Sequence, residues 1–323
     1  RLVINYCRNL TCICSNISPE HVGALCDLLH WNRKLTDLRL THIANCNIEL
    51  ISQVTCSNLR RLSVSACPEI LSFPWHNFVG PQLRFLHLES LYELRCEKLP
   101  VIGELCPSLE CCALRFVPVA DSVLTRFVSS CPSIVNLDLA GNHKLTDAGV
   151  LRVVTSLPKL QILVLHGCFS LSGRALDHIA VHCKHTLYEL AVDVRCYDTA
   201  ALTAVLQSCV HLRVLALDAV DTLSTTLLEP LFAHTGKLLE LSVSGTLMTD
   251  EVLCLVGKCC HNLRELVASN TTYDGTILPV HLDGSPCALA YGCPHLQLVV
   301  LDSAEIIPST APAVELDPPA GEI

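Results

Sequence analysis

The chain has 323 residues, of which 50% are hydrophobic and 16% are charged, and its formal net charge is −9. This composition supplies enough apolar side chains for a continuous core and excludes a disordered chain. The negative charge argues against general nucleic-acid binding, which depends on neutralising phosphates, and no apolar stretch has the length of a membrane helix.

One repeated pattern supplies the predicted strands. The motif L-x-x-L-x-L recurs at spacings of 24 to 27 residues, with a last spacing of 33. It starts at Leu35, Leu59, Leu83, Leu109, Ile134, Leu160, Leu187, Leu212, Leu238, Leu263 and Leu296. A clipped copy at residues 2–7, LVINYC, matches residues 163–168, LVLHGC, and opens the chain. This period indicates a repeat protein with about eleven full units and a clipped first one.

In the second half of each unit, the apolar residues have a different spacing. In the unit that begins at Ile134, the apolar residues from Val150 to Leu157 fall at helical spacing. Asp147, or Thr146 beside it, is predicted to cap the start of this helix. Corresponding helix starts are predicted at Leu171-Ser172 and at Met248-Thr249-Asp250.

A single strand–helix unit cannot bury its own apolar face, whereas a stack of such units can. Parallel strands would lie about 4.8 Å apart on the inner face, and the wider helices would force the stack to curve. The predicted fold class is therefore α/β, a solenoid horseshoe over residues 1–304 with a parallel sheet on the concave face and helices on the convex face.

The repeat resembles the leucine-rich repeat of the cysteine-containing subtype. The form C-x-x-L-x-x-L-x-L starts at Cys56, Cys106, Cys131, Cys209, Cys260 and Cys293. The segment Leu145–Val150, LTDAGV, also fits this subtype, and Cys67 and Cys168 fill the slot at the end of a strand. The repeats are similar to those of F-box/LRR ubiquitin-ligase substrate receptors. No segment of this chain resembles an F-box.

The cysteines have a structural interpretation and a chemical one. A thiol is small and apolar enough to pack where each helix returns to the sheet, so we expect the six repeat-phased cysteines to be buried, reduced and metal-free. Cys112 should be buried and Cys111 should face the concave side. The 21 cysteines include no Cys-x-x-Cys pair and favour a reducing compartment, cytoplasmic or nuclear.

No catalytic motif accompanies the repeats. The sequence contains no Gly-x-Ser-x-Gly, no Walker loop and no His-Glu-x-x-His. We therefore expect no enzyme activity, no cofactor and no metal site.

Two segments interrupt the array. In residues 72–82, Pro, Trp and Phe replace a helix; Phe73, Trp75 and Phe78 either plug the gap or extend a binding face at the rim, and the plug is the favoured interpretation. Residues 270–295 lengthen one unit and are predicted to form a rim loop.

Function is expected on the concave face, where the residues between the leucines point. The units up to Ile134 place three arginines and three acids there. From Leu187 onward the same positions hold six acids and no Lys or Arg: Glu189, Asp193, Asp218, Glu240, Glu265 and Asp302. The unit before them contributes the apolar residues Ile162 and Val164. We expect the first five of these acids to lie on successive strands and to form one ladder. The acids either face solvent without a partner, or bind a basic protein segment that Ile162 and Val164 anchor.

The two ends carry expectations of their own. Because the chain starts within a predicted strand, and a solenoid needs polar caps, we expect something to precede Arg1: either the sequence is a fragment, or another domain or chain covers the edge. Residues 305–323 are Pro-rich and acidic and are predicted to be an extended or disordered tail.

The resemblance implies a protein–protein interaction module, as the substrate-recognition part of an SCF-type ubiquitin ligase. In such receptors an F-box ahead of the repeats holds the ligase adaptor. The alternative is a structural scaffold or adaptor without ligase activity, of the cytoskeletal, ciliary or cell-cycle kind. Neither reading includes a nucleic-acid or membrane partner.

Overall fold

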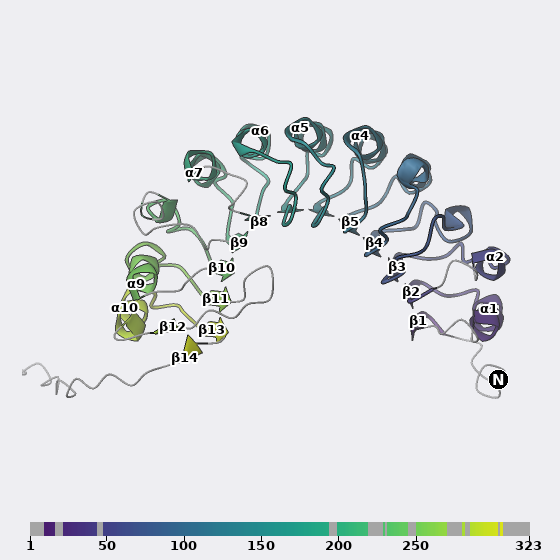
Figure 1. Cartoon of the computed structure of the whole chain (residues 1–323), viewed down its shortest axis with the longest axis horizontal. Coiled ribbons are helices and arrows are strands. Elements are labelled where there is room, and N and C mark those ends of the chain that lie inside the picture. The colour runs from purple at the N-terminus through teal and green to yellow at the C-terminus, as the bar shows by residue number, and fades with distance from the viewer. Residues whose placement is uncertain are drawn as a thin grey trace, which may run out of the picture.

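The protein forms a curved solenoid, a horseshoe with strands inside and helices outside (Figure 1). The computed structural model describes residues 10–16, 22–43, 48–193, 199–218, 229, 231–244, 250–269, 280–281, 285–302 and 304–305. The predicted fold class is confirmed. The clipped strand at residues 2–7 and the tail from residue 306 lie outside the described residues.

Twelve parallel strands follow one another in sequence order in a single sheet. They are β1 (Cys12–Asn16), β2 (Asp37–Thr41), β3 (Arg61–Ser65), β4 (Phe85–Glu89), β5 (Cys111–Arg115), β6 (Asn136–Asp138), β7 (Ile162–Val164), β8 (Glu189–Asp193), β9 (Val214–Asp218), β10 (Glu240–Ser244), β11 (Glu265–Ser269) and β13 (Leu298–Asp302). Every predicted strand from Leu35 onward is present. The pattern missed β1, whose unit begins at Leu10, because Ser15 stands where the third leucine would be.

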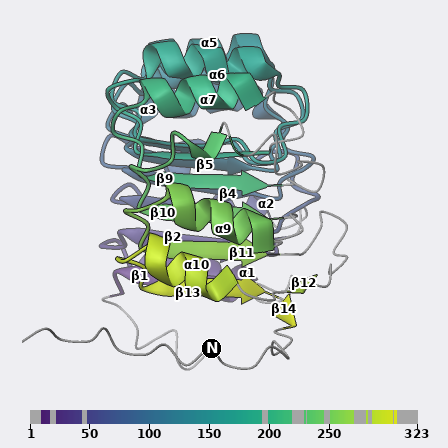
Figure 2. The same cartoon turned by 90° about the vertical axis from the view of Figure 1, so that its left-hand side faces the viewer.

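The helices cover the convex side of the sheet, as the end-on view also shows (Figure 2). They are α1 (Val22–Trp31), α2 (Ile48–Ile51), α3 (Leu99–Leu105), α4 (Asp121–Ser130), α5 (Asp147–Ser156), α6 (Gly173–His182), α7 (Thr199–Ser208), α9 (Asp250–Cys259) and α10 (Ser285–Gly292). No helix in the described part of the chain is long and apolar enough to cross a membrane.

The helix starts are tied together across units. Ser172 caps α6, as predicted, through its hydroxyl and the Arg174 amide. Thr146 occupies the position before α5 but makes no side-chain cap of its own. Instead, the Asp121 carboxylate of the preceding unit accepts from the Thr146 amide and hydroxyl at 3.0 and 2.6 Å, and Asp147 accepts from Ser172 at 2.8 and 2.6 Å. These acids therefore join neighbouring units, and the prediction that Asp147 caps its own helix is wrong.

The irregular segment at residues 72–82 fills the core. A 3₁₀ turn, η3 (Trp75–Asn77), replaces the helix, and Phe73, Trp75 and Phe78 are buried. The Phe73 ring centre lies 4.7 Å from that of Trp75 and 5.3 Å from that of Phe78. The favoured interpretation, a plug in place of the missing helix, is confirmed.

The second interruption is only partly described. Within residues 270–295 the structure has α10 and the short strand β12 (Val280–His281). This strand pairs with β14 (Ala304–Glu305), so the first residue of the predicted tail is paired. The expected rim loop at residues 270–279 lies outside the described residues.

The repeat-phased cysteines lie in the core. All six predicted positions are at most 6% exposed, and none is in a disulfide. Burial raises the pKa of the Cys56 thiol to about 11 and that of the Cys131 thiol to about 12. These thiols therefore stay protonated at neutral pH, which suits packing rather than nucleophilic chemistry.

Candidate functional site: the concave sheet face

The concave surface is organised in three rows, because the parallel register places equivalent residues of successive strands side by side. The first row holds Asp37, Arg61, Phe85, Cys111, Asn136, Ile162, Glu189, Val214, Glu240, Glu265 and Leu298. The second row runs from Arg39 through Ser63, His87, Ala113, Asp138 and Val164 to Val300. The third row lies at the strand ends and includes Glu89, Arg115, Asp193 and Asp218.

The predicted acids occupy two rows instead of one ladder. Glu240 and Glu265 are direct neighbours on β10 and β11. Glu189 is separated from Glu240 by Val214 of β9. Asp193 and Asp218 are neighbours in the third row. The expectation of one ladder on successive strands is therefore wrong, because Glu189 and Asp193 share a strand and Val214 interrupts the first row.

Asp193 is 3% exposed, so its predicted place on the open face is also wrong. Asp218 is accessible, because its side chain is 39% exposed. Its Oδ2 lies 2.8 Å from Nδ1 of His166, a residue that follows β7, so this contact reaches across β8. The side chain of Asp302 lies outside the described residues; its backbone pairs with Ser269. We call Glu189, Asp218, Glu240 and Glu265 the acidic half, and it lies on β8–β11.

The acids of this half influence one another. The pKa of Glu189 is raised, first by partial burial and then by the negative charges of Glu240 and Asp138. A raised carboxylate pKa means that the ionised form is disfavoured in the folded state. Beside Glu189, the predicted apolar residues Ile162 and Val164 lie half-buried on β7.

A hollow of about 500 Å³ lies at the other end of the concave face, between β2 and β6. In its lining, the short side chains of Ser63 and Ala113 lie on either side of His87 in the second row. Further lining residues are Arg39, Arg61, Phe85, Cys111, Arg115, Asn136 and Asp138. The sequence places arginines and acids on this part of the concave face but does not predict a hollow.

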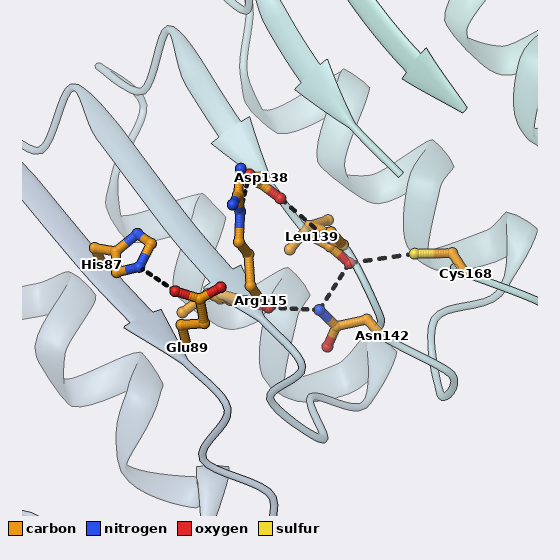
Figure 3. A network of polar contacts seen from close by, with 9 residues as sticks. His87, Glu89, Arg115, Asp138, Leu139, Asn142 and Cys168 are labelled. Carbon is orange, nitrogen blue, oxygen red and sulfur yellow. Dashed lines mark hydrogen bonds and ion pairs between the residues drawn. The ribbon is translucent and has the colours of Figure 1, made fainter. Parts of the chain in front are cut away.

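The charged side chains that line the hollow are mostly paired. Arg61 Nε lies 3.5 Å from Asp37 Oδ1, and its guanidinium carbon is 4.3 Å from the centre of the Phe85 ring. Arg115 Nε donates to Asp138 Oδ2 at 2.5 Å (Figure 3). Asp138 also accepts from the Ala140 amide at 3.0 Å.

The remaining acid, Glu89, has its Oε2 3.0 Å from Nε2 of His87 (Figure 3). Arg39 is exposed and forms no ion pair with any described residue. Among the arginines that line the hollow, Arg39 is therefore the one without an acidic partner within the described residues.

Buried polar side chains behind the strands hold this face in place. Asn142 donates to the carbonyls of Leu114 and Leu139 at 2.6 and 2.8 Å, and Cys168 donates to Leu139 at 3.2 Å (Figure 3). Such buried bonds fix the ends of neighbouring strands relative to one another. The concave rows are thus presented on a rigid frame.

Within the described residues, no group of three His, Cys, Asp or Glu side chains is placed to hold a metal ion. Cys111 faces the hollow, as predicted, and Cys112 is buried, as predicted. Burial raises the pKa of the Cys111 thiol, so it is a weak nucleophile. The arrangement is suited to binding along an open surface.

No protein-family model matches the chain. Two curated proteins of Arabidopsis thaliana are similar in sequence: one described as F-box/LRR-repeat protein 9, 27% identical over 146 residues, and F-box protein SKIP1, 26% identical over 162 residues. Each match covers 43% of this chain. The chain spans 58% and 53% of the length of these relatives.

Solved structures with the same fold include the leucine-rich-repeat protein LegL7 from Legionella pneumophila, with a TM-score of 0.52 and 16% identity over 79% of this chain and 86% of that chain. A chain of the yeast Rad7–Elc1 complex has a TM-score of 0.50 and 17% identity over 94% of this chain and 88% of that one. At these identities the likeness concerns the fold alone. The chain therefore has the fold of a leucine-rich-repeat solenoid, and part of its sequence is similar to F-box/LRR-repeat proteins.

Proposed function

We propose that the protein is an interaction module that holds a segment of a protein partner against its concave face. The observation that carries this proposal is the concave sheet itself, a continuous surface with a hollow at one end and the acidic half at the other. A horseshoe offers an extended surface for contact with a partner.

In its finer form the proposal assigns the module to substrate recognition in an SCF-type ubiquitin ligase, in the cytoplasm or nucleus. The names of the two Arabidopsis relatives support this assignment. The ligase adaptor would then be held by an F-box domain outside this sequence. A scaffold or adaptor without ligase activity is the alternative, because the binding face would serve it equally well.

The acidic half would bind a basic stretch of the partner. Glu240 and Glu265 are directly opposed across neighbouring strands, and like charges in that position repel. A Lys- or Arg-rich segment would relieve the repulsion, and Ile162 and Val164 would provide apolar contact beside it. Charge would mainly set the association rate and specificity, whereas apolar burial would set the residence time.

A labelled peptide with four consecutive lysines tests this assignment. Its association with the full chain should weaken with rising salt, because salt screens exposed charges from one another. At physiological ionic strength, exposed charges more than roughly 8 Å apart interact only weakly. The double variant Glu189→Lys, Glu240→Lys should bind it at least about fivefold more weakly, mainly through a slower association rate.

The matched control is Glu104→Lys, Asp177→Lys, which makes the same change in net charge on exposed convex positions of α3 and α6. This control should bind the lysine peptide like the unchanged protein. Equal losses in the two double variants would mean that only net charge matters, and the proposed basic-segment face would be abandoned.

A further inference from the structure

We infer that the hollow between β2 and β6 receives an acidic stretch of the same partner segment whose basic stretch lies on β8–β11, so that the segment binds with one polarity. This inference rests on the proposed function of the acidic half and adds a second, oppositely charged contact. The occupant is a protein segment with carboxylates at one end and Lys or Arg at the other.

The charge balance of the two regions supports this polarity. The acidic half carries four carboxylates on the concave face, those of Glu189, Asp218, Glu240 and Glu265, and the rows of β8–β11 hold no Lys or Arg. The concave rows of β2–β6, in which the hollow lies, carry three arginines and three acids, so their charges cancel before His87 is considered. An acidic group is therefore repelled by one end of the face and tolerated at the other.

An unpaired arginine in the hollow should attract a carboxylate of the partner segment. Two of its arginines already face acids, and Glu89 is beside His87, which leaves the exposed Arg39 as the surplus cation. A guanidinium can bind a carboxylate through two parallel hydrogen bonds. An acidic side chain that enters at β2 would meet Arg39 before any unpaired acid.

Arg61 supplies a second, preorganised donor group next to Arg39. Its guanidinium rests on the Phe85 ring, which restricts the side chain and lowers the entropy lost on binding. Its contact with Asp37 is 3.5 Å long and joins side chains that are 43% and 29% exposed. Such a solvent-exposed pair is weak, so the guanidinium of Arg61 can donate hydrogen bonds to a carboxylate of the bound segment.

The spacing between the two contacts sets the length of the bound segment. Five strand-to-strand steps separate β3 from β8, which is about 24 Å at 4.8 Å per step. An extended chain covers this distance with roughly eight residues. The stretch between the two charged ends would pass over β6 and β7, where Ile162 and Val164 offer apolar contact.

Three labelled peptides and the full chain test the inference by fluorescence anisotropy in about 0.15 M salt, where the acidic half is screened from the hollow. The first peptide has four glutamates, an eight-residue Gly/Ser spacer and four lysines. The second has the same composition with alternating charges. The third carries only the four glutamates and the spacer.

The decisive variant is Arg39→Glu, and Arg126→Glu on the exposed side of α4 is the charge-matched control. We expect the glutamate peptide to bind the unchanged protein and the Arg126→Glu variant alike, and to bind Arg39→Glu about tenfold more weakly. The block peptide should bind the unchanged protein more tightly than the alternating peptide does. Arg39 is exposed, so this substitution leaves the leucine core intact.

The inference is overturned if the glutamate peptide fails to bind, if it binds Arg39→Glu as well as the unchanged protein, or if block and alternating peptides bind equally. The proposed function is judged separately with the lysine peptide. If that peptide depends on Glu189 and Glu240, the basic-segment face stands whatever the glutamate peptide does.

Discussion

The two ends of the concave face share one backbone frame but use their charges in opposite ways. Between β2 and β6, most charged side chains are matched with a partner across or along the strands. On β8–β11, Glu240 and Glu265 lie side by side without any Lys or Arg in the rows. Because the core repeats and the charges do not, the concave residues, and not the fold, must carry the specificity of this protein.

The largest expected effect comes from breaking a matched pair in the hollow. Asp138→Ala removes both the buried partner of Arg115 and the acceptor of the Ala140 amide. We expect a loss of about 2–3 kcal/mol in the free energy of unfolding, measured by urea denaturation. Glu240→Ala is the counterpart in the acidic half and should change stability by less than about 0.5 kcal/mol. Equal losses would mean that the two ends do not differ in this way.

The cysteine core should matter at both ends of the molecule. Cys131→Ser places a hydroxyl where the nearest acceptors, the carbonyls of Gly103 and Cys106, are 3.6 Å from the present sulfur. It should cost roughly 1–3 kcal/mol of unfolding free energy.

Cys260→Ser should cost less, because the Thr235 hydroxyl already lies 3.1 Å from that sulfur. Thermal or urea unfolding of the two variants checks the order. A larger loss for Cys260→Ser would show that local packing, and not hydrogen bonding, decides the cost.

Removing like charges in the acidic half should have the opposite sign. The double variant Glu240→Gln, Glu265→Gln relieves the repulsion between directly opposed carboxylates. We expect the free protein to gain about 0.2–1 kcal/mol of unfolding free energy at low salt and less at high salt. A loss of stability in urea melts would mean that these acids have stabilising partners.

The smallest expected effect is a pH dependence at Glu189. Its pKa in the folded state is raised, so the stability that it contributes is present at acidic pH and is lost as the pH rises through the folded-state pKa. Glu189→Gln should therefore be more stable than the unchanged protein at neutral pH, with the difference vanishing in acid. Denaturation midpoints at a series of pH values check this, and a difference that grows in acid would contradict it.

The repeated core could be predicted from the sequence because each leucine position is fixed by the same local rule in every unit. The strand at β1 was missed where Ser15 broke the rule. Alternation along each strand also predicts which residues face the concave side. It does not predict which of these residues lie next to each other on adjacent strands. Val214 between Glu189 and Glu240, and the burial of Asp193, depend on which side chains face each other on adjacent strands.

The hollow could not be predicted from the sequence, because it also depends on contacts between different repeat units. The short side chains of Ser63 and Ala113 lie between larger side chains of other units. Arg61 and Arg115 are oriented by their ion pairs with acids of neighbouring strands. The contacts between units at the helix starts were hidden as well. The Asp121 carboxylate occupies space that a side chain at position 149 would fill: a Cβ on Gly149 would lie 2.2 Å from its Oδ1.

The most direct test of the central claim is to map where each end of a bound segment lies. The block peptide with four glutamates and four lysines can carry a photo-crosslinker at either end, and mass spectrometry can identify the attached residues on the full chain. The account predicts crosslinks from the lysine end on β8–β11 and from the glutamate end on β2–β5. Crosslinks from both ends spread evenly over the concave strands, or found on the convex helices, would contradict it.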